Sequence, residues 1–323
     1  MKNYFTKESF GNGWKILKGT FTGFIDDKAL KLSASLSYYT VFSLGPLLLL
    51  LISLVGFFLG KEAIQGQLFG EINGMVGNNA AIQIQEMVQN LELSGKTTSA
   101  VIIGVITLII GATSVFGEIQ DSINIIWRVK AKPKRGWVKL LKDRLLSSSL
   151  IVGLGFLLIV SLVVNGALQA LNDLLRNYFP DVTVIAFNIL NIVISFAVIS
   201  LLFGVIFKVL PDVKIHWKDV RMGAFFTACL FMLGRFLIGL YIETAGTEST
   251  YGAAGSVIVI LVWVYYTAAI LYFGAEFTRV YADHIGLKIE PADYAVYVEQ
   301  TEREMDKKTI PLGEKKSSPS TEK

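Results

Sequence analysis

The longest stretch without a charged residue runs from Leu32 to Gly60, between Lys31 and Lys61. A helix needs about 20 apolar residues to cross the roughly 30 Å hydrocarbon core of a bilayer, so this stretch is long enough to span it with some tilt. Soluble domains rarely contain such a stretch, because about a quarter of their residues are charged. Only 17% of this chain is charged and 53% is hydrophobic. We therefore predict an integral membrane protein.

Five further runs with few or no charges follow the first. Together they predict an all-α, polytopic membrane protein, with a transmembrane domain at 32–282 that contains six transmembrane helices. The expected spans are at about 36–60, 97–120, 146–171, 182–207, 222–242 and 251–275. Gly45 and Pro46 lie inside the first span, where proline removes a backbone hydrogen bond and is expected to kink the helix. Such a kink is either a static bend or a hinge.

The Lys and Arg residues alternate between the two sides of this predicted topology. The N-terminal region, the second and fourth connections between spans and the C-terminal tail together hold 26 of them. The first, third and fifth connections hold three. Cytoplasmic loops of membrane proteins carry an excess of Lys and Arg. We therefore expect a multi-pass membrane protein with both termini in the cytoplasm.

Residues 1–31 are polar, with apolar side chains at a helical spacing. These side chains recur every three or four residues: Phe10, Trp14, Leu17, Phe21 and Phe24. The spacing predicts an amphipathic helix, and aromatic and lysine side chains both favour the membrane interface. We expect this helix on the cytoplasmic membrane surface; a soluble helix packed on the inner loops is the alternative. A cleaved signal peptide is not expected, because no short apolar core precedes a small-residue cleavage site.

The two remaining polar regions are the first outer connection and the C-terminal tail. In the connection, residues 80–93 predict a helix that rests on the outer face. Bends or close packing are expected before it at four glycines: Gly66, Gly70, Gly74 and Gly77. Residues 283–323 form a cytoplasmic tail, which is rich in Lys, Glu, Ser and Pro and expected to be largely disordered after about residue 297.

Three stretches resemble one known family. They are LSYYTVFSLGPLLLLLISLVG at 36–56, GATSVFGEIQDSINIIWRV at 111–129 and YGAAGSVIVILVWVYYTAAILYFGAEFTRVYA at 251–282. They are similar to the YihY / virulence factor BrkB family of bacterial inner-membrane proteins, once mislabelled ribonuclease BN. The resemblance covers roughly residues 15–285. It implies a six-helix, multi-pass protein of the bacterial inner (plasma) membrane without an agreed biochemical activity. Some members are linked to lipid or lipopolysaccharide export and some to virulence. It implies no catalytic residue.

Polar side chains in the outer half of the spans suggest a binding site. A charge near the bilayer centre costs about 2.5–3.5 kcal/mol on insertion scales, so it faces protein or water. Arg235 lies in the fifth span, Asn188 and Asn191 lie in the fourth, and Asn165 lies in the third. We predict a polar cavity in which Arg235 binds a phosphate or carboxylate head group, which its planar guanidinium suits. Alternatively, the asparagines join helices by hydrogen bonds and Arg235 snorkels or pairs with Glu243.

Carboxylates gather at the inner ends of two spans. Glu118 and Asp121 lie on one helical face at the end of the second span, and Glu276 ends the sixth. Three cations are available to pair with them: Lys208, Arg128 and Arg279. We expect such pairs to lock the inner helix ends together; a proton or cation relay is the alternative.

The sequence predicts no enzyme, cofactor or metal site. The two histidines, His216 and His284, lie at or beyond the inner ends of spans, and the one cysteine, Cys229, lies in an apolar run, so no metal-ligand spacing occurs. Hydrolase and nucleotide-binding motifs are absent from the sequence. The basic loop RVKAKPKRGWVK is explained by topology and by attraction to anionic lipid, so no nucleic-acid partner is expected.

These observations favour a transporter or flippase-like protein for lipids or other amphipathic anions that does not itself use ATP. Its expected partners are membrane lipids. A non-transporting membrane scaffold that recruits envelope proteins is the alternative, and a homo-oligomer fits either function. Small residues four apart, as in Gly56 to Gly60, permit close helix contact but are common in any helix bundle.

Overall fold

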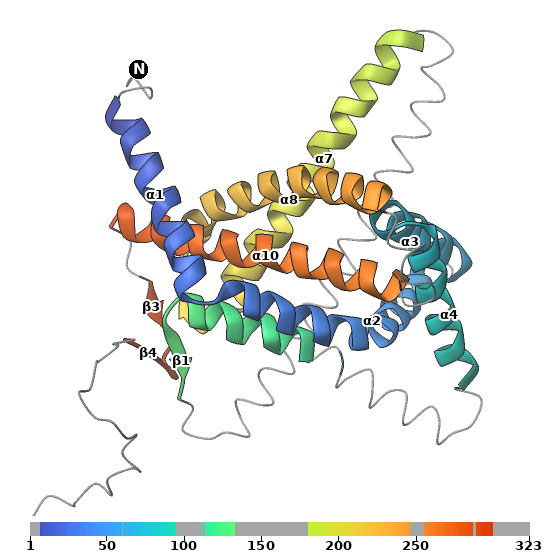
Figure 1. Ribbon diagram of the computed structural model, residues 1–323, viewed down its shortest axis with the longest axis horizontal. Coiled ribbons are helices and arrows are strands. Elements are labelled where there is room, and N and C mark those ends of the chain that lie inside the picture. Colours follow the sequence, from blue (N-terminus) through green and yellow to red (C-terminus); the bar gives the residue numbers. More distant parts are fainter. Residues whose placement is uncertain are drawn as a thin grey trace, which may run out of the picture.

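The computed structural model describes residues 7–59, 61–94, 111, 114–132, 180–245, 255–286 and 289–299. These residues are mostly helical (Figure 1). The helices are α1 (Lys7–Asp26), α2 (Ala29–Leu59), α3 (Lys61–Val76), α4 (Asn78–Ser94), α7 (Pro180–Val209), α8 (Trp217–Ala245) and α10 (Gly255–His284), and residues 114–126 are also helical. Four short strands are present: β1 (Val129–Ala131), β2 (Val213–Lys214), β3 (Glu290–Pro291) and β4 (Ala295–Tyr297).

Three of the described helices are long and apolar enough to cross a membrane, over Ile189–Val209, Trp217–Ile238 and Gly255–His284. They coincide with the fourth, fifth and sixth predicted spans, which confirms a helical chain with membrane-spanning character. The third predicted span and most of the second lie outside the described residues. The total of six spans and the cytoplasmic termini stay predictions.

Helix α10 lies at the centre of the bundle, between α2 and α8 (Figure 1). Helix α7 packs on α8 through two edge-to-face aromatic pairs, Phe196 with Phe225 and Phe203 with Phe231. It crosses α8 steeply, and its N-terminal half points away from the bundle (Figure 1). Helix α2 continues as one helix through the buried Gly45 and Pro46.

Two Gly-x-x-x-Thr pairs hold α8 and α10 close together. Thr227 on α8 fills the space above Gly274 on α10, and Thr278 on α10 fills the space above Gly223 on α8. Each threonine hydroxyl donates to the carbonyl of the glycine four residues earlier in its own helix, at 2.6 Å and 2.7 Å. The polar group is thereby satisfied inside its own helix, and the absent glycine side chains allow close backbone approach.

Helices α3 and α4 replace the expected run of bends in the first outer connection. Gly66, Gly70 and Gly74 lie inside α3, so no bend occurs at them, and nothing described lies within 4 Å of a side chain added there, so they make no close packing contact either. The chain bends at Gly77, as expected, with a φ of +85°. The two helices are packed rather than loosely resting on the outer face. They bury side chains in a hydrophobic cluster that they share with α2 and α10: Leu48, Ile52, Phe69, Val76, Ala80, Ile84, Val88, Val259, Ile260 and Val264.

Helix α1 lies across one end of the bundle rather than along its axis (Figure 1). Its small residues seat it on α10, because a side chain at Gly19 would touch Val280 and one at Gly23 would overlap Glu276. Its opposite face leaves apolar side chains exposed, including Trp14, Phe21 and Ile25. The amphipathic helix predicted for residues 1–31 is thus present as α1, and its contact with a membrane surface stays a prediction.

The same turn ends α1 and the helical residues 114–126. In each, two successive N–H groups donate to carbonyls four and three residues back, and the second residue is left-handed: Lys28 has φ 53° and Arg128 has φ 58°. Left-handed backbone costs a non-glycine residue roughly 1–2 kcal/mol. Both turns therefore need compensating contacts.

Filling the space between α8 and α10 should destabilise the protein. In Gly274→Ala the added methyl group overlaps the Thr227 hydroxyl, and in Gly223→Ala it overlaps Thr278. We expect each substitution to lower the free energy of unfolding by about 1–3 kcal/mol, as overpacking does. Thermal unfolding in detergent measures this. Gly13→Ala on α1 is the control, since nothing lies within 4 Å of its new methyl group; equal melting of Gly274→Ala and wild type would contradict the packing.

Relieving the left-handed residue after α1 should stabilise the protein. Lys28 is exposed, and Lys28→Gly removes the left-handed cost without removing a buried contact. We expect the free energy of unfolding to rise by about 1 kcal/mol. The same change at exposed Lys18, inside α1, should lower it by about 0.5–1 kcal/mol. Melting temperatures of the two variants that shift in the same direction would refute this assignment.

Candidate functional site

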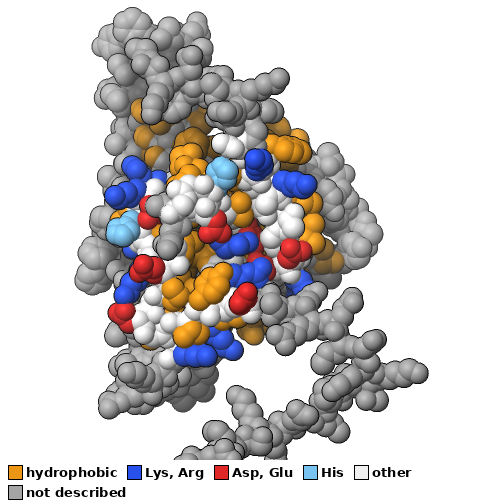
Figure 2. Space-filling model, turned by 90° about the vertical axis from the view of Figure 1, so that its left-hand side faces the viewer, with side chains coloured by type: hydrophobic (Ala, Val, Ile, Leu, Met, Phe, Trp, Pro, Cys, Tyr) orange, Lys and Arg blue, Asp and Glu red, His pale blue; other side chains and the backbone are white. Residues whose placement is uncertain are grey.

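Polar and charged side chains concentrate at one end of the bundle, which we call the capped end. It contains α1, the four strands and the helix ends at Ile126, Val209, Trp217 and His284. Figure 2 looks onto it and shows Lys, Arg, Asp and Glu side chains interspersed with hydrophobic ones. By the positive-inside count this is the predicted cytoplasmic end.

Two small antiparallel sheets close the capped end. β1 pairs with β4, with Lys130 opposite Val296, and β2 pairs with β3. Lys214 on β2 also pairs with Asp293 at 2.5 Å. The hydrogen bond to Asp293 and its negative charge raise the pKa of Lys214 above its usual value. Because both side chains are exposed, this pair adds little stability.

A buried carboxylate, Asp212, joins three segments of the cap. Its oxygens accept hydrogen bonds from Gln120 Nε2 at 3.1 Å, Asn124 Nδ2 at 2.9 Å and the Tyr294 hydroxyl at 2.9 Å. Its own N–H donates to Asn124 Oδ1 at 2.9 Å. Buried carboxylates need such donors, because an unsatisfied one is costly. Asp212 therefore fixes the C-terminal segment 289–299 against the bundle.

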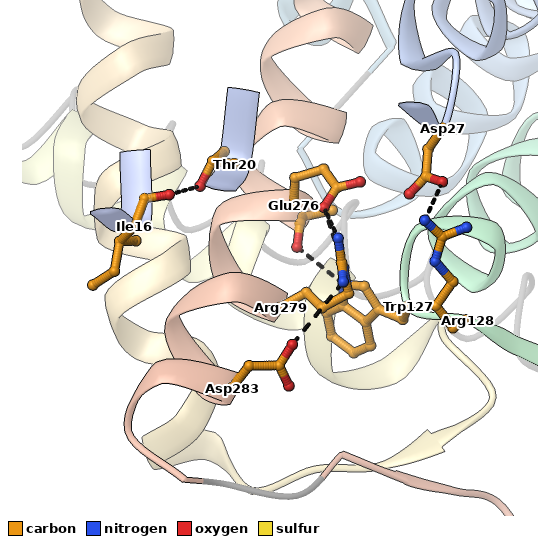
Figure 3. A network of polar contacts seen from close by, with 9 residues as sticks. Ile16, Thr20, Asp27, Trp127, Arg128, Glu276, Arg279 and Asp283 are labelled. Atoms are coloured by element: carbon orange, nitrogen blue, oxygen red, sulfur yellow. Dashed lines mark hydrogen bonds and ion pairs between the residues drawn. The ribbon is translucent and has the colours of Figure 1, made fainter. Parts of the chain in front are cut away.

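Two ion pairs lie where α1 meets α10 (Figure 3). Asp27 Oδ1 is 2.7 Å from Arg128 Nη2, and Glu276 Oε2 is 2.8 Å from Arg279 Nη2. Both carboxylate side chains have 0% exposure, and both guanidiniums are largely buried. The indole N–H of Trp127 donates to the carbonyl of Ala275 at 3.0 Å, directly beside Glu276. Long-range partners thus hold this cluster in place.

The structure places the predicted inner carboxylates in different surroundings. Glu276 is buried beside Arg279, Asp121 is exposed, and Glu118 is partly buried on the helical residues 114–126. Lys208 donates to the carbonyl of Ile215 and so caps the α7–α8 loop.

Sequence reasoning missed Asp27 and Asp212, the two other buried carboxylates of this end. The signal available for each is an acidic residue at the end of an apolar helix, in FIDDKAL and in KVLPDVK.

The outer polar residues are not joined in the part of the chain that is described. Arg235 lies exposed on α8, and no hydrogen bond or ion pair connects it to a described residue. Asn191 lies exposed on α7, about 120–140° around that helix from the phenylalanines that face α8. Asn165 and the side chain of Asn188 lie outside the described residues, as does the side chain of Glu243. A cavity shared by these residues stays a prediction.

An open pocket of about 480 Å³ lies at the capped end, beside β1. Its charged lining comes from Asp121, Arg128 and Lys130. Among the described residues, no group of three or more His, Cys, Asp or Glu side chains is placed to hold a metal ion.

Comparison with known proteins identifies the family. The sequence model of the virulence factor BrkB family matches residues 20–295. The chain belongs to the BrkB family. A UPF0761 membrane protein of Pseudomonas paraeruginosa is 29% identical over 83% of this chain, and one of Tolumonas auensis is 27% identical over 78%. This chain spans 63% of the Pseudomonas protein and 80% of the Tolumonas protein. No solved structure matches the chain.

The BrkB match includes both the bundle and the cap. It extends from within α1 to the first residue of β4, so all the buried carboxylates described above lie inside it. The relatives are described as membrane proteins, in agreement with the apolar helices found here.

Removing the cation of the first ion pair should expose the cost of burying Asp27. In Arg128→Gln the Asp27 carboxylate loses its partner, and we expect the free energy of unfolding to fall by about 3–5 kcal/mol. The double variant Asp27→Asn/Arg128→Gln should recover most of that loss. Chemical denaturation of the four proteins in a double-mutant cycle measures the coupling. Lys130→Gln, at an exposed position on β1, is the control, and its free energy of unfolding should stay within about 0.5 kcal/mol of the wild-type value. If the effects of Asp27→Asn and Arg128→Gln on the free energy of unfolding simply add, the two residues are not a coupled pair.

Proposed function

We propose that this BrkB-family protein moves or arranges amphipathic anionic molecules, membrane lipids among them, in the bacterial inner membrane. It does so without hydrolysing ATP itself, and it acts as a transporter or flippase-like protein rather than an enzyme. The observation that carries the proposal is Arg235, a cation on an apolar helix whose side chain is exposed and has no partner among the described residues.

The position of Arg235 on α8 favours contact with a molecule that enters from the side. Arg235 follows Phe231 by one helical turn and Ala224 by about three, so it continues the side of α8 that faces α7. At Phe231 the two helices are still in contact, with ring centroids 5.8 Å apart. Beyond that crossing α7 diverges from α8 (Figure 1). Arg235 therefore lies on the α7 side of α8, past the point of contact.

A guanidinium in this position suits an anionic head group. It presents donors in a planar fork that binds phosphate or carboxylate through two parallel hydrogen bonds. A charge exposed to lipid would be costly, and a head group or water supplies its counterpart. The acyl chains could stay in the surrounding bilayer while the head group binds. This arrangement supports lipids over water-soluble anions.

A non-transporting scaffold is the second candidate, and α1 favours it. Trp14, Phe21 and Ile25 are 67%, 59% and 57% exposed on the face of α1 that does not contact α10. A partner protein or the membrane surface would cover such a stripe. The scaffold would depend on α1 and tolerate changes at Arg235, whereas the transporter would show the reverse.

Lipid movement in reconstituted vesicles tests the proposed function. Purified protein is placed in liposomes that contain a fluorescent anionic phospholipid, and translocation is followed by quenching of the outer leaflet. We expect translocation above that of empty liposomes, and a fall of about tenfold in Arg235→Gln, which loses the charged fork. Arg221→Gln is the matched control, since Arg221 is an exposed arginine on the same helix at the capped end.

The outcomes separate the two candidates. Equal rates in Arg235→Gln and wild type would remove Arg235 from the lipid path. No translocation by folded wild type would contradict the proposal and favour the scaffold.

A further inference from the structure

The ion pairs at the capped end leave buried oxygens unsatisfied. Glu276 Oε1 and Asp27 Oδ2 have no partner among the described residues, and Asp27 Oδ1 has only its ion pair with Arg128. Glu276 and Asp27 lie close enough to interact with each other, Glu276 on α10 and Asp27 at the turn after α1 (Figure 3). Buried polar atoms without partners are rare in proteins and call for an explanation.

The charges around this pair do not balance. Three carboxylates share the cluster, because Asp283 Oδ2 is 4.0 Å from Arg279 Nη1 in addition to the two buried carboxylates. Among the residues that the structure describes, two guanidiniums pair with them, Arg128 and Arg279. One negative charge is therefore in excess. The other titratable groups nearby are Tyr272, one turn before Glu276 on α10, and Glu118, which acts on Tyr272.

We propose that Asp27 and Glu276 hold one proton between them, and that this proton keeps α1 seated on α10. Two like charges in a buried site cannot both ionise cheaply, and a shared proton turns their repulsion into a hydrogen bond. The bond would satisfy one oxygen of each residue. It would also reduce three negative charges to two, which matches the two arginines.

Because α1 packs directly on the Asp27–Glu276 pair, its position depends on this proton. Gly23 lies against the Glu276 carboxylate and the Arg279 guanidinium, so α1 has no side chain between itself and the cluster. The turn at Asp27 and Lys28, where the backbone is left-handed, connects α1 to α2. Loss of the proton leaves two facing carboxylates directly under this turn. Repulsion then lifts the C-terminal part of α1 from α10 while α2 stays in the bundle.

Infrared spectroscopy and a distance measurement on the full-length protein in nanodiscs test the two parts of the proposal. Near neutral pH we expect the carbonyl band of a protonated carboxylic acid, lost in both Glu276→Gln and Asp27→Asn because either change removes the pair. Asp293→Asn is the control and should keep the band, since Asp293 is 86% exposed and pairs with Lys214 outside the cluster.

The position of α1 relative to the bundle is measured as the distance between two spin labels. The labels are attached at Asn12→Cys on α1 and Lys218→Cys on α8, both exposed positions, in a protein that also carries Cys229→Ser. We expect one narrow distance at about pH 5 and a several-fold smaller population of it at about pH 9, where the shared proton is lost. In Glu276→Gln the neutral amide replaces the shared proton, so the distance should stay narrow throughout.

Each outcome decides the matter. A band that disappears from wild type as the narrow distance is lost supports the proposal. Absence of the band from folded wild type, its loss in Asp293→Asn, or a wild-type distance that does not change with pH overturns it. These readouts do not depend on lipid movement, so they stand or fall separately from the proposed function.

Discussion

The close approach of α8 to α10 is the contact on which the rest of the structure depends. It exists because Gly223 and Gly274 have no side chains and because each opposing threonine satisfies its hydroxyl within its own helix. Glu276 follows Gly274 by two residues, so this contact also sets the depth of the buried carboxylate. The ring of Phe226 on α8 stacks on that of Phe277 on α10, with ring centroids 3.9 Å apart, and extends the same interface. A larger residue at either glycine would displace both the helix and the charge that it carries.

The two ends of the bundle are held in different ways. At the capped end, α1, the residues after 126, the α7–α8 loop and the C-terminal segment are joined by ion pairs, by Asp212 and by two sheets. Burying an ion pair costs desolvation energy, so these pairs add little to the free energy of unfolding. They do fix how the segments are arranged, because leaving one partner buried without the other is costly. At the other end, α2, α3, α4 and α10 share an apolar cluster, and α7 leaves α8 (Figure 1).

The sequence predicts the helices better than their contacts. Apolar runs alone located α7, α8 and α10, because a bilayer-crossing helix needs a length of apolar residues that nothing else in a chain requires. The glycines of α3 misled the prediction, since packing against α2 and α10 outweighs their low helix propensity. Glu276 was found as a charge at a span end. Its neighbour Asp27 was not, because a pairing across about 250 residues leaves no local pattern in one sequence.

A link between the proton at the cap and a substrate at Arg235 would have to follow a particular route. Arg235 is on α8 and Glu276 is on α10, but the interlocked Gly–Thr pairs prevent these two helices from sliding past each other without strain. Helix α2 has no such restraint in its contact with α1. It begins two residues after Asp27 and contains Pro46, which removes a backbone hydrogen bond midway along it. A signal from the cap would therefore pass through the α1–α2 turn and along α2, and would reach α8 only by way of the packing at the far end.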